Sequence, residues 1–295
     1  MKPVTVLASA LGLYAWGCTD LLAEEAHAEI YQRATNEFAE ADFFKPAEPK
    51  TNDVTFSLAP LILQEVNGGK EPLSRLDRFG TLSLSNGVLV LDRSRPAIYW
   101  QADSVQINGR AHTRFSYLWC YALAPAGQYA SPAGLPLQGI RVTLGSAGQP
   151  VIWEVLADDS GAQLIYISRN LEAAAVAEFG KPLPGRHYSI ERSPEEAPKV
   201  IVARIIDDGP VAMGPIIYLS ADARDVATLI CRCMPAQAKR LLGTSVYDLL
   251  PSQAVAAPSL LAQAKVLARE QTAFWPGDPP SSDQLERRLW LPSGF

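Results

Sequence analysis

Four polar side chains around residue 110 have the types needed to bind a charged ligand: Asp103, Arg110, His112 and Arg114. Strand alternation would place all four on one face of a predicted hairpin. Such a cluster of imidazole, guanidinium and carboxylate groups could hold an anionic or sugar-like ligand. The alternative is a cross-strand ion pair between Asp103 and Arg114 on a solvated face, with His112 beside it. These four residues are therefore candidate ligand-binding residues.

A second group combines the residue types of a hydrolytic triad. His187, Ser189 and Glu191 would point the same way if residues 185–192 formed a strand. Neighbours two apart on a strand lie about 7 Å apart, whereas a nucleophile and its base must lie within about 3 Å. The serine also lacks a G-x-S-x-G elbow and an S-x-x-K motif. We therefore expect an ordinary strand face here, and no catalytic residue is assigned.

The cysteines allow either a disulfide or a metal site. Four are present, Cys18, Cys120, Cys231 and Cys233, and N-terminal processing would leave three. In an oxidising compartment Cys120 could pair with one member of the C-x-C motif, which leaves one thiol free unless two chains are linked. Two thiolates at this spacing could also chelate a metal. Because no second C-x-C and no nearby histidine completes such a site, we predict a disulfide or buried thiols and no metal.

No linear motif indicates a cofactor or a nucleic-acid partner. The acid pairs Asp158-Asp159 and Asp207-Asp208 lack the alternating spacing of a calcium loop, so turn chemistry is the better interpretation. Walker, dinucleotide-binding, H-E-x-x-H and C-x-x-C motifs are absent from the sequence, so no cofactor is predicted. The 26 Lys and Arg against 31 Asp and Glu form no basic stripe, which argues against nucleic-acid binding.

Two Asn-Gly dipeptides predict the hairpins that would position these side chains. Asn86-Gly87 and Asn108-Gly109 can adopt the positive φ values of a two-residue type I′ turn. The predicted pairs are Leu82 with Leu91, Leu84 with Leu89, Trp100 with Tyr117, Ala102 with Phe115 and Asp103 with Arg114. The second hairpin would then have one apolar, largely aromatic face: Ile98, Trp100, Phe115, Tyr117 and Trp119.

The remaining elements suggest an α+β fold. Further strands are predicted at 139–144, 151–156, 163–168, 186–192, 199–206 and 216–219. Helices are predicted at 21–44, 171–179, 220–232, 237–242 and 260–271. Strands followed by helices favour an antiparallel β-rich body of hairpins and meander, covered by a few helices and ending in a helical C-terminal part.

The expected domain organisation has four parts. Residues 1–17 form a signal peptide, and residues 18–53 form an amphipathic helix and a Pro/Lys linker. The body covers 54–271, and an alternative divides it around 124–136. A Pro-rich tail, 272–295, follows, with Trp290 and Phe295 as expected packing anchors.

The N-terminus has the pattern of a secretory signal. Lys2 precedes an almost wholly apolar stretch from Val4 to Trp16, and the first acidic residue is Asp20. This stretch is shorter than the roughly 20 residues that a transmembrane helix needs. We therefore expect the protein to be exported.

Two processing sites fit this signal. Ala15-Trp16-Gly17-Cys18 resembles the bacterial lipobox, in which the cysteine is acylated after cleavage, although Ala15 and Trp16 depart from its usual residues. Cleavage there implies a lipoprotein anchored in the cell envelope, periplasmic or on the outer surface. The alternative is the small-x-small site at 26–28, with cleavage before Glu29, which implies a secreted protein.

Two functions are compatible with these observations. The first is a non-catalytic envelope protein whose β-rich body binds another envelope component or a small ligand. The alternative is an extracytoplasmic hydrolase that uses His112 or His187 as its base. A buried pocket that holds either histidine beside a serine or a carboxylate would favour the hydrolase.

Overall fold

The structure is a computed structural model, and it describes the chain in eleven stretches. These are residues 38–48, 53–66, 78–85, 88–121, 137–156, 163–193, 200–209, 211–221, 225–232, 238–252 and 283–295. The described strands are β1 (Phe38–Pro46), β2 (Leu61–Glu65), β3 (Thr81–Ser85), β4 (Val88–Asp92), β5 (Ala97–Ile107), β6 (Arg110–Cys120), β7 (Leu137–Leu144), β8 (Pro150–Val155), β9 (Gln163–Ser168), β10 (Val200–Ile206), β11 (Pro215–Leu219), β12 (Val226–Cys231) and β13 (Ala238–Pro251). The described helices are α2 (Val54–Ser57), α3 (Arg169–Phe179) and α5 (Asp283–Arg288).

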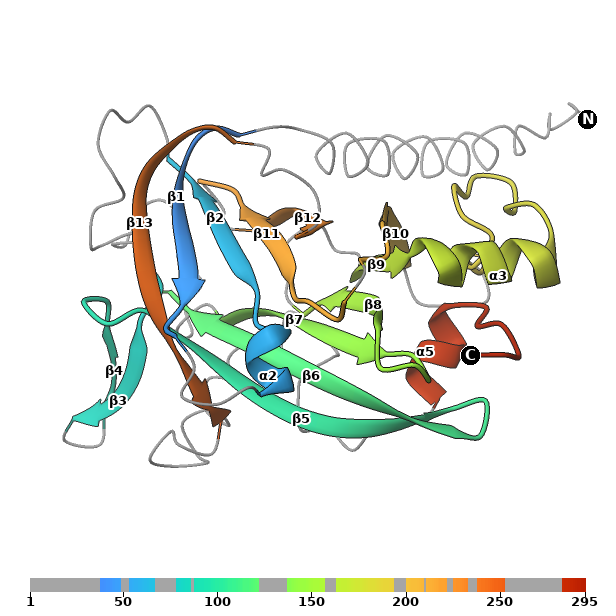
Figure 1. Cartoon of the computed structure of the whole chain (residues 1–295), viewed down its shortest axis with the longest axis horizontal. Helices are drawn as coiled ribbons and strands as arrows, with labels where there is room; N and C mark the ends of the chain where they lie inside the picture. The colour runs from blue at the N-terminus through green and yellow to red at the C-terminus, as the bar shows by residue number, and fades with distance from the viewer. Residues whose placement is uncertain are drawn as a thin grey trace, which may run out of the picture.

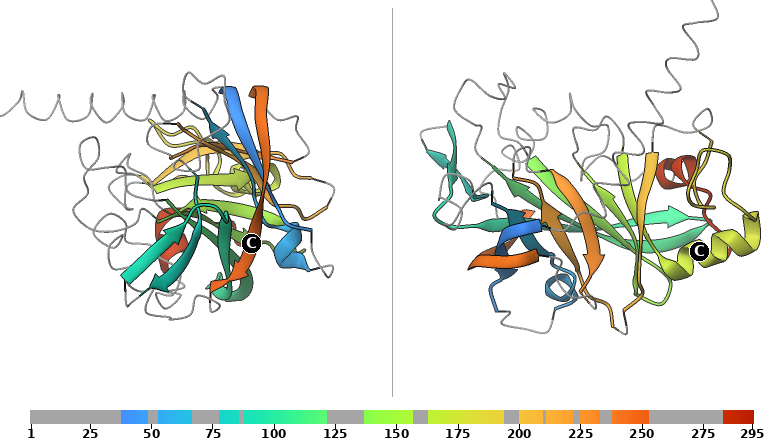
Figure 2. Two further views of the ribbon diagram at one scale, coloured as in Figure 1. Left: turned by 90° about the vertical axis from the view of Figure 1, so that its left-hand side faces the viewer. Right: turned by 90° about the horizontal axis from the view of Figure 1, so that it is seen from above.

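Eleven of these strands form one large mixed sheet in the order β10-β9-β8-β7-β6-β5-β13-β1-β2-β11-β12. The sheet curls until its two edge strands, β10 and β12, approach each other, which makes it nearly closed and barrel-like (Figures 1 and 2). Strands β3 and β4 form a separate two-stranded sheet that projects to one side (Figure 1). None of the described helices is long and apolar enough to cross a membrane.

Strand β13 lies in the middle of this sheet although it is the last strand described. Its first part pairs in parallel with β1, from Ala238 to Tyr247, and its last four residues pair in parallel with β5, from Asp248 to Pro251. In the order of the sheet, β13 therefore joins two groups of described strands. One group is β10-β9-β8-β7-β6-β5, and the other is β1-β2-β11-β12. Figure 1 shows it as the long strand beside β1 that runs down to β5.

The two faces of the sheet are buried by different means. Large side chains fill the inside of the curl, among them Phe44, Tyr117, Trp119, Trp153 and Tyr247. The outer face of β8, β9 and β10 is covered instead by α3 and by the C-terminal segment with α5. Because both faces of these strands are buried, their sequences are apolar almost throughout, as expected of an enclosed strand.

The two Asn-Gly hairpins are confirmed in the predicted register. Strand β3 pairs with β4 as Leu82 to Leu91 and Leu84 to Leu89. Strand β5 pairs with β6 through all three predicted pairs, including Asp103 to Arg114. At the second turn Asn108 and Gly109 both have positive φ, 49° and 74°, as a type I′ turn requires. The aromatic face of this hairpin packs into the core as expected.

The predicted α+β fold with a helical C-terminal part is wrong, because the described chain is mostly strand. The predicted helices at 220–232 and 237–242 contain β12 and the start of β13, and residues 38–44 belong to β1. These segments extend because each gains a ladder of hydrogen bonds from at least one neighbouring strand, which outweighs a weak local helix preference. The sheet is also mixed rather than antiparallel. The predicted helix at 260–271 and residues 21–37 lie outside the described residues.

Candidate ligand-binding cavity

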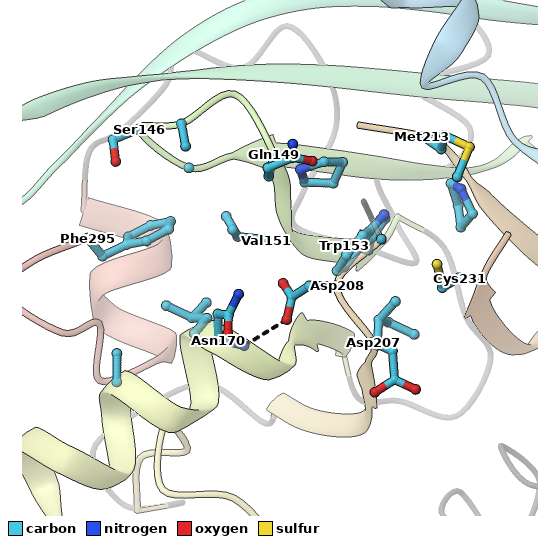
Figure 3. Close-up of a pocket in the computed structure, with 18 of the residues that line it drawn as sticks. Ser146, Gln149, Val151, Trp153, Asn170, Asp207, Asp208, Met213, Cys231 and Phe295 are labelled. Atoms are coloured by element: carbon cyan, nitrogen blue, oxygen red, sulfur yellow. Dashed lines mark hydrogen bonds between the residues drawn. The ribbon is translucent and has the colours of Figure 1, made fainter. Parts of the chain in front are cut away.

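A cavity of about 690 Å³ lies at one end of the curled sheet. Its walls come from β8 and the turn that precedes it, one side of α3, the segment from the end of β10 to the start of β11, the end of β12, and the C-terminal segment with Phe295. Figure 3 shows these side chains around a common space, with Phe295 at one side and Met213 and Cys231 at the other. The cavity therefore combines residues that lie far apart in the sequence.

The inner wall of the cavity is formed by Trp153. Within β8 this residue pairs with Tyr166 of β9 and Val142 of β7, and strand alternation turns its side chain towards the inside of the curl, as it does for Val155. Trp153 is only 5% exposed, and no described residue accepts a hydrogen bond from its buried Nε1. A buried donor without an acceptor costs about 1–3 kcal/mol, and this nitrogen is covered by protein atoms.

The rim of the cavity is acidic. The Asp207 carboxylate accepts hydrogen bonds from the guanidinium of Arg169, at 2.7 Å from Nε, and Asp208 Oδ2 accepts one from the backbone N–H of Asn170 at 3.0 Å. Figure 3 shows the second contact, with the Asp208 carboxylate between Asn170 and Trp153. Asp207 and Asp208, which were predicted from sequence to be turn residues, therefore bind the first turn of α3. Among the described residues no group of three or more His, Cys, Asp or Glu could hold a metal ion.

Helix α3 is fixed at both ends by local chemistry. Its N-cap is Ser168, whose Oγ accepts a hydrogen bond from the N–H of Leu171 at 3.2 Å, so the helix begins two residues before the predicted start at 171. Gly180, with a φ of 87°, ends the helix after 179, the predicted last residue. Since Asn170 is inside the first turn, its free N–H is available to Asp208.

The start of β11 is anchored against α2, which fixes the opposite wall of the cavity. The N–H of Gly214 donates a hydrogen bond to the carbonyl of Ser57 at 2.8 Å. A Cβ atom at position 214 would overlap the carbonyl oxygens of Leu58 and Ala59. Only glycine allows this close approach, so the wall between Met213 and Pro215 has a defined position.

Two of the four candidate residues of the second hairpin, Arg110 and His112, contact the C-terminal segment. Arg110 Nη1 donates to the carbonyl of Gly294 at 2.8 Å. His112 is 3% exposed, and its ring stacks on that of Phe295. Its Nδ1 lies 2.9 Å from the carbonyl oxygen of Leu144, so Nδ1 carries the proton and donates it, while the buried Nε2 has no hydrogen-bond partner among the described residues. Packing of this segment buries His112, whereas Arg110 stays exposed.

Asp103 and Arg114 form the predicted cross-strand ion pair. Two nitrogens of the guanidinium donate to the carboxylate, Nε to Oδ1 at 2.8 Å and Nη2 to Oδ2 at 2.9 Å. The pair lies on the outer face of the sheet, where Arg114 is almost completely buried. Neither residue lines the cavity.

Helix α5 brings a further arginine onto the same outer face. Arg288 Nη1 lies 3.2 Å from Glu154 Oε1 and donates to Gln163 Oε1 at 2.6 Å. Glu154 Oε2 also lies 3.8 Å from Arg141 Nη1. Burial lowers the pKa of Arg288 to about 10, and the Glu154 carboxylate opposes that shift. This buried network fastens α5 to the sheet.

The predicted strand at 186–192 is instead a series of turns, and its polar residues serve that backbone. Glu191 Oε2 accepts hydrogen bonds from the N–H groups of His187 and Tyr188, at 3.1 and 3.0 Å. Ser189 Oγ donates to the carbonyl of Gly180 at 2.7 Å. The positive φ of Gly185, 74°, breaks the extended backbone that the prediction required. The structure therefore does not bring His187, Ser189 and Glu191 together as a triad.

The cysteines differ in state. Cys120 is free and completely buried, and burial raises the pKa of its thiol far above the ordinary value. Cys231 is disulfide-bonded, to a partner outside the described residues, and it lines the cavity. Cys18 and Cys233 lie outside the described residues.

Sequence reasoning did not identify the cavity. Trp153 falls inside a correctly predicted strand, but its sequence neighbours give no sign that its indole N–H lacks an acceptor. Comparison with protein-family models, with curated proteins and with solved structures gave no match for this chain. Functional inference therefore depends on the cavity itself.

Proposed function

We propose that this protein is a non-catalytic binding protein that holds a small, mainly apolar ligand in the cavity beside Trp153. The observation that carries this proposal is the 690 Å³ cavity itself, which distant segments of the chain enclose and the side chain of Trp153 lines.

The size and lining of the cavity support the proposal. Ligand sites of small molecules occupy about 300–1,000 Å³ and combine apolar walls with a few polar groups. Here the walls include Val151, Leu171, Met213, Ile230 and Phe295, and the polar groups are few and placed at the rim. Burying an apolar ligand surface against these side chains is favourable by about 25 cal/mol per Å².

The hydrolase alternative receives no support from the arrangement of the histidines. Neither His112 nor His187 lines the cavity. Ser146, the serine among its described lining residues, therefore has no described histidine beside it in the lining. His112 is buried against Phe295, whereas His187 is exposed. A general base must lie within hydrogen-bond reach of the group that it activates.

The binding experiment uses 2-decanone, a ketone that accepts hydrogen bonds and donates none. We expect saturable binding by isothermal titration calorimetry, weakened about two- to tenfold by Trp153→Phe, because the smaller ring removes part of the apolar surface of the wall. Trp100→Phe is the matched control, since Trp100 packs against the core outside the cavity. Absence of saturable binding, or equal affinity for wild type and Trp153→Phe, would contradict the proposal.

Export and anchoring belong to the same proposal, which places the binding protein in the cell envelope. The apolar stretch from Val4 to Trp16 supports export, and Cys18 is the residue that would carry lipid. Mass spectrometry of the mature N-terminus tests this part separately. Diacylated Cys18 would identify a lipoprotein, Glu29 as the first residue a secreted protein, and an intact Met1 would refute export.

A further inference from the structure

The hairpin of β3 and β4 forms a sheet of its own. It pairs with no other described strand, and it projects from the body of the molecule (Figure 1). A two-stranded hairpin is only marginally stable by itself, and further strands stabilise it. We propose that β4 pairs in antiparallel orientation with β4 of a second copy of this chain, which gives a four-stranded sheet across a twofold axis.

The outer edge of β4 presents backbone groups without a partner in the described part of the chain. The N–H of Leu82 donates to the Tyr99 hydroxyl at 2.7 Å, so it points away from β4, and its pair with Leu91 is not hydrogen-bonded. Hydrogen-bonded and non-hydrogen-bonded pairs alternate along an antiparallel ladder. The backbone N–H and C=O groups of Leu89 and Leu91 therefore face away from β3, and no described strand or loop binds them.

Strand β4 also lacks the features that protect an open edge. Its sequence, VLVLD, contains no proline or lysine, it shows no bulge against β3, and Val90 is 41% exposed. Natural edge strands are usually blocked by such features or covered by another segment. The edge of β10 is covered: the N–H of Val202 donates to Glu191 Oε1 at 3.1 Å, and Arg186 Nη1 donates to the carbonyl of Val200 at 2.9 Å. The chain thus covers the edge of β10 and leaves that of β4 open.

The pattern of β4 fits a copy of itself. A register centred on Val90 places Leu89 of each strand opposite Leu91 of the other, and each of these pairs can exchange both of its backbone hydrogen bonds. The same register places Asp92, the charged residue of β4, opposite Val88 of the other copy rather than opposite a second Asp92. Because like charges do not face each other, the pairing carries no electrostatic penalty across the strands.

The outer edge of β3 limits this assembly to two copies. In addition to the contact of Leu82 with Tyr99, the N–H of Gly80 donates to the carbonyl of Cys120 at 3.1 Å. These contacts hold β3 against β5 and β6, so that edge is not open to a further strand. The interface is therefore isologous and closed. Since two five-residue strands bury little surface, we expect a weak and reversible dimer.

The test is sedimentation velocity of the mature protein from about 10 μM to about 1 mM, a range that suits a small interface. We expect wild type to change from monomer to dimer as its concentration rises. Val90→Lys places two lysines opposite each other at the centre of the interface, so the dimer should weaken about five- to thirtyfold. Val90→Asp should weaken it similarly. An equimolar mixture of the two variants should associate more tightly than either variant alone, because opposite charges then face each other.

Val176→Lys is the matched control. Val176 lies on α3 and is 47% exposed, close to the exposure of Val90, so the variant adds the same charge at a similar surface position outside β4. It should associate as wild type does. Unchanged urea unfolding verifies that the variants are folded. The proposal is overturned if wild type is monomeric at every concentration, if Val90→Lys dimerises as tightly as wild type, or if mixing the two charge variants gains nothing.

Discussion

The rings of His112 and Phe295 stack with their centroids 4.6 Å apart and their planes inclined by 18°. His112 belongs to β6, and Phe295 belongs to the C-terminal segment. The stack therefore packs the C-terminal segment against the sheet. Because Phe295 also lines the cavity, this contact joins the hairpin identified from sequence to the site identified from structure.

Phe295→Ala should destabilise the protein and weaken ligand binding. Removal of the ring exposes His112 and opens one wall of the cavity. Truncation of a buried phenylalanine costs about 3–5 kcal/mol, and we expect a value near the lower limit here because Phe295 is 9% exposed. Urea unfolding and 2-decanone calorimetry measure the two effects. Phe295→Leu should retain most of the stability and most of the affinity for 2-decanone. An unchanged free energy of unfolding for Phe295→Ala would show that the stack does not stabilise the protein.

Glu191 should make stability fall as the pH rises. Burial raises the pKa of this carboxyl above its ordinary value of 4.5 in spite of hydrogen bonds from Val202, Tyr188 and His187. Between the unfolded and folded pKa values the folded protein retains a proton that the unfolded chain has released, so the contribution of Glu191 to stability decreases through that window. Other carboxyl groups also titrate in this pH range. The effect of Glu191 is therefore measured as the difference in free energy of unfolding between wild type and a variant.

Glu191→Gln provides this comparison because its side chain stays neutral at every pH. The free energy of unfolding of wild type relative to this variant should decrease from pH 4 upwards, as urea unfolding at several pH values would show. A constant difference would mean that Glu191 is not perturbed as described.

Arg288→Leu should be far more destabilising than the same change at the neighbouring Arg287. The first substitution removes the guanidinium that meets Glu154 at 3.2 Å, while Arg287 is exposed on the same helix. Breaking a buried pair costs about 3–5 kcal/mol, because the remaining charge stays buried. Thermal and urea unfolding of the two variants measure the contrast, and equal effects would show that the buried network does not fasten α5.

Cys120 should be unreactive in the folded protein. Its thiol is buried and its pKa is raised, so the thiolate that reacts with iodoacetamide is scarce. Mass spectrometry after labelling at neutral pH should find Cys120 unmodified in native protein and fully modified in urea. Rapid labelling of the native protein would contradict the burial.

The hairpins could be predicted because their information is local. Asn108 and Gly109 supply the turn, and the turn then determines every cross-strand pair, including Asp103 with Arg114. Strand β9 and the end of α3 at Gly180 were predicted for the same reason, from a short apolar run and a glycine.

The remaining fold depends on partners that sequence reasoning could not supply. Strand β13 is rich in residues that also suit a helix, and its extended form depends on β1 and β5, which lie far from it in the sequence. The cavity has the same origin, since Trp153, Asp208 and Phe295 become neighbours only when three distant segments meet. Sequence therefore identified polar candidates on the hairpin and missed the site beside them.

The central position of β13 determines when the sheet can be completed during synthesis. During synthesis both groups of sheet strands leave the ribosome before residues 238–251, yet these residues supply their only connection within the sheet. Until β13 arrives, the edges of β5 and β1 are open to wrong partners, and pairing over such long sequence separations is slow. The two groups of described strands can therefore join into one sheet only after residues 238–251 have been synthesised.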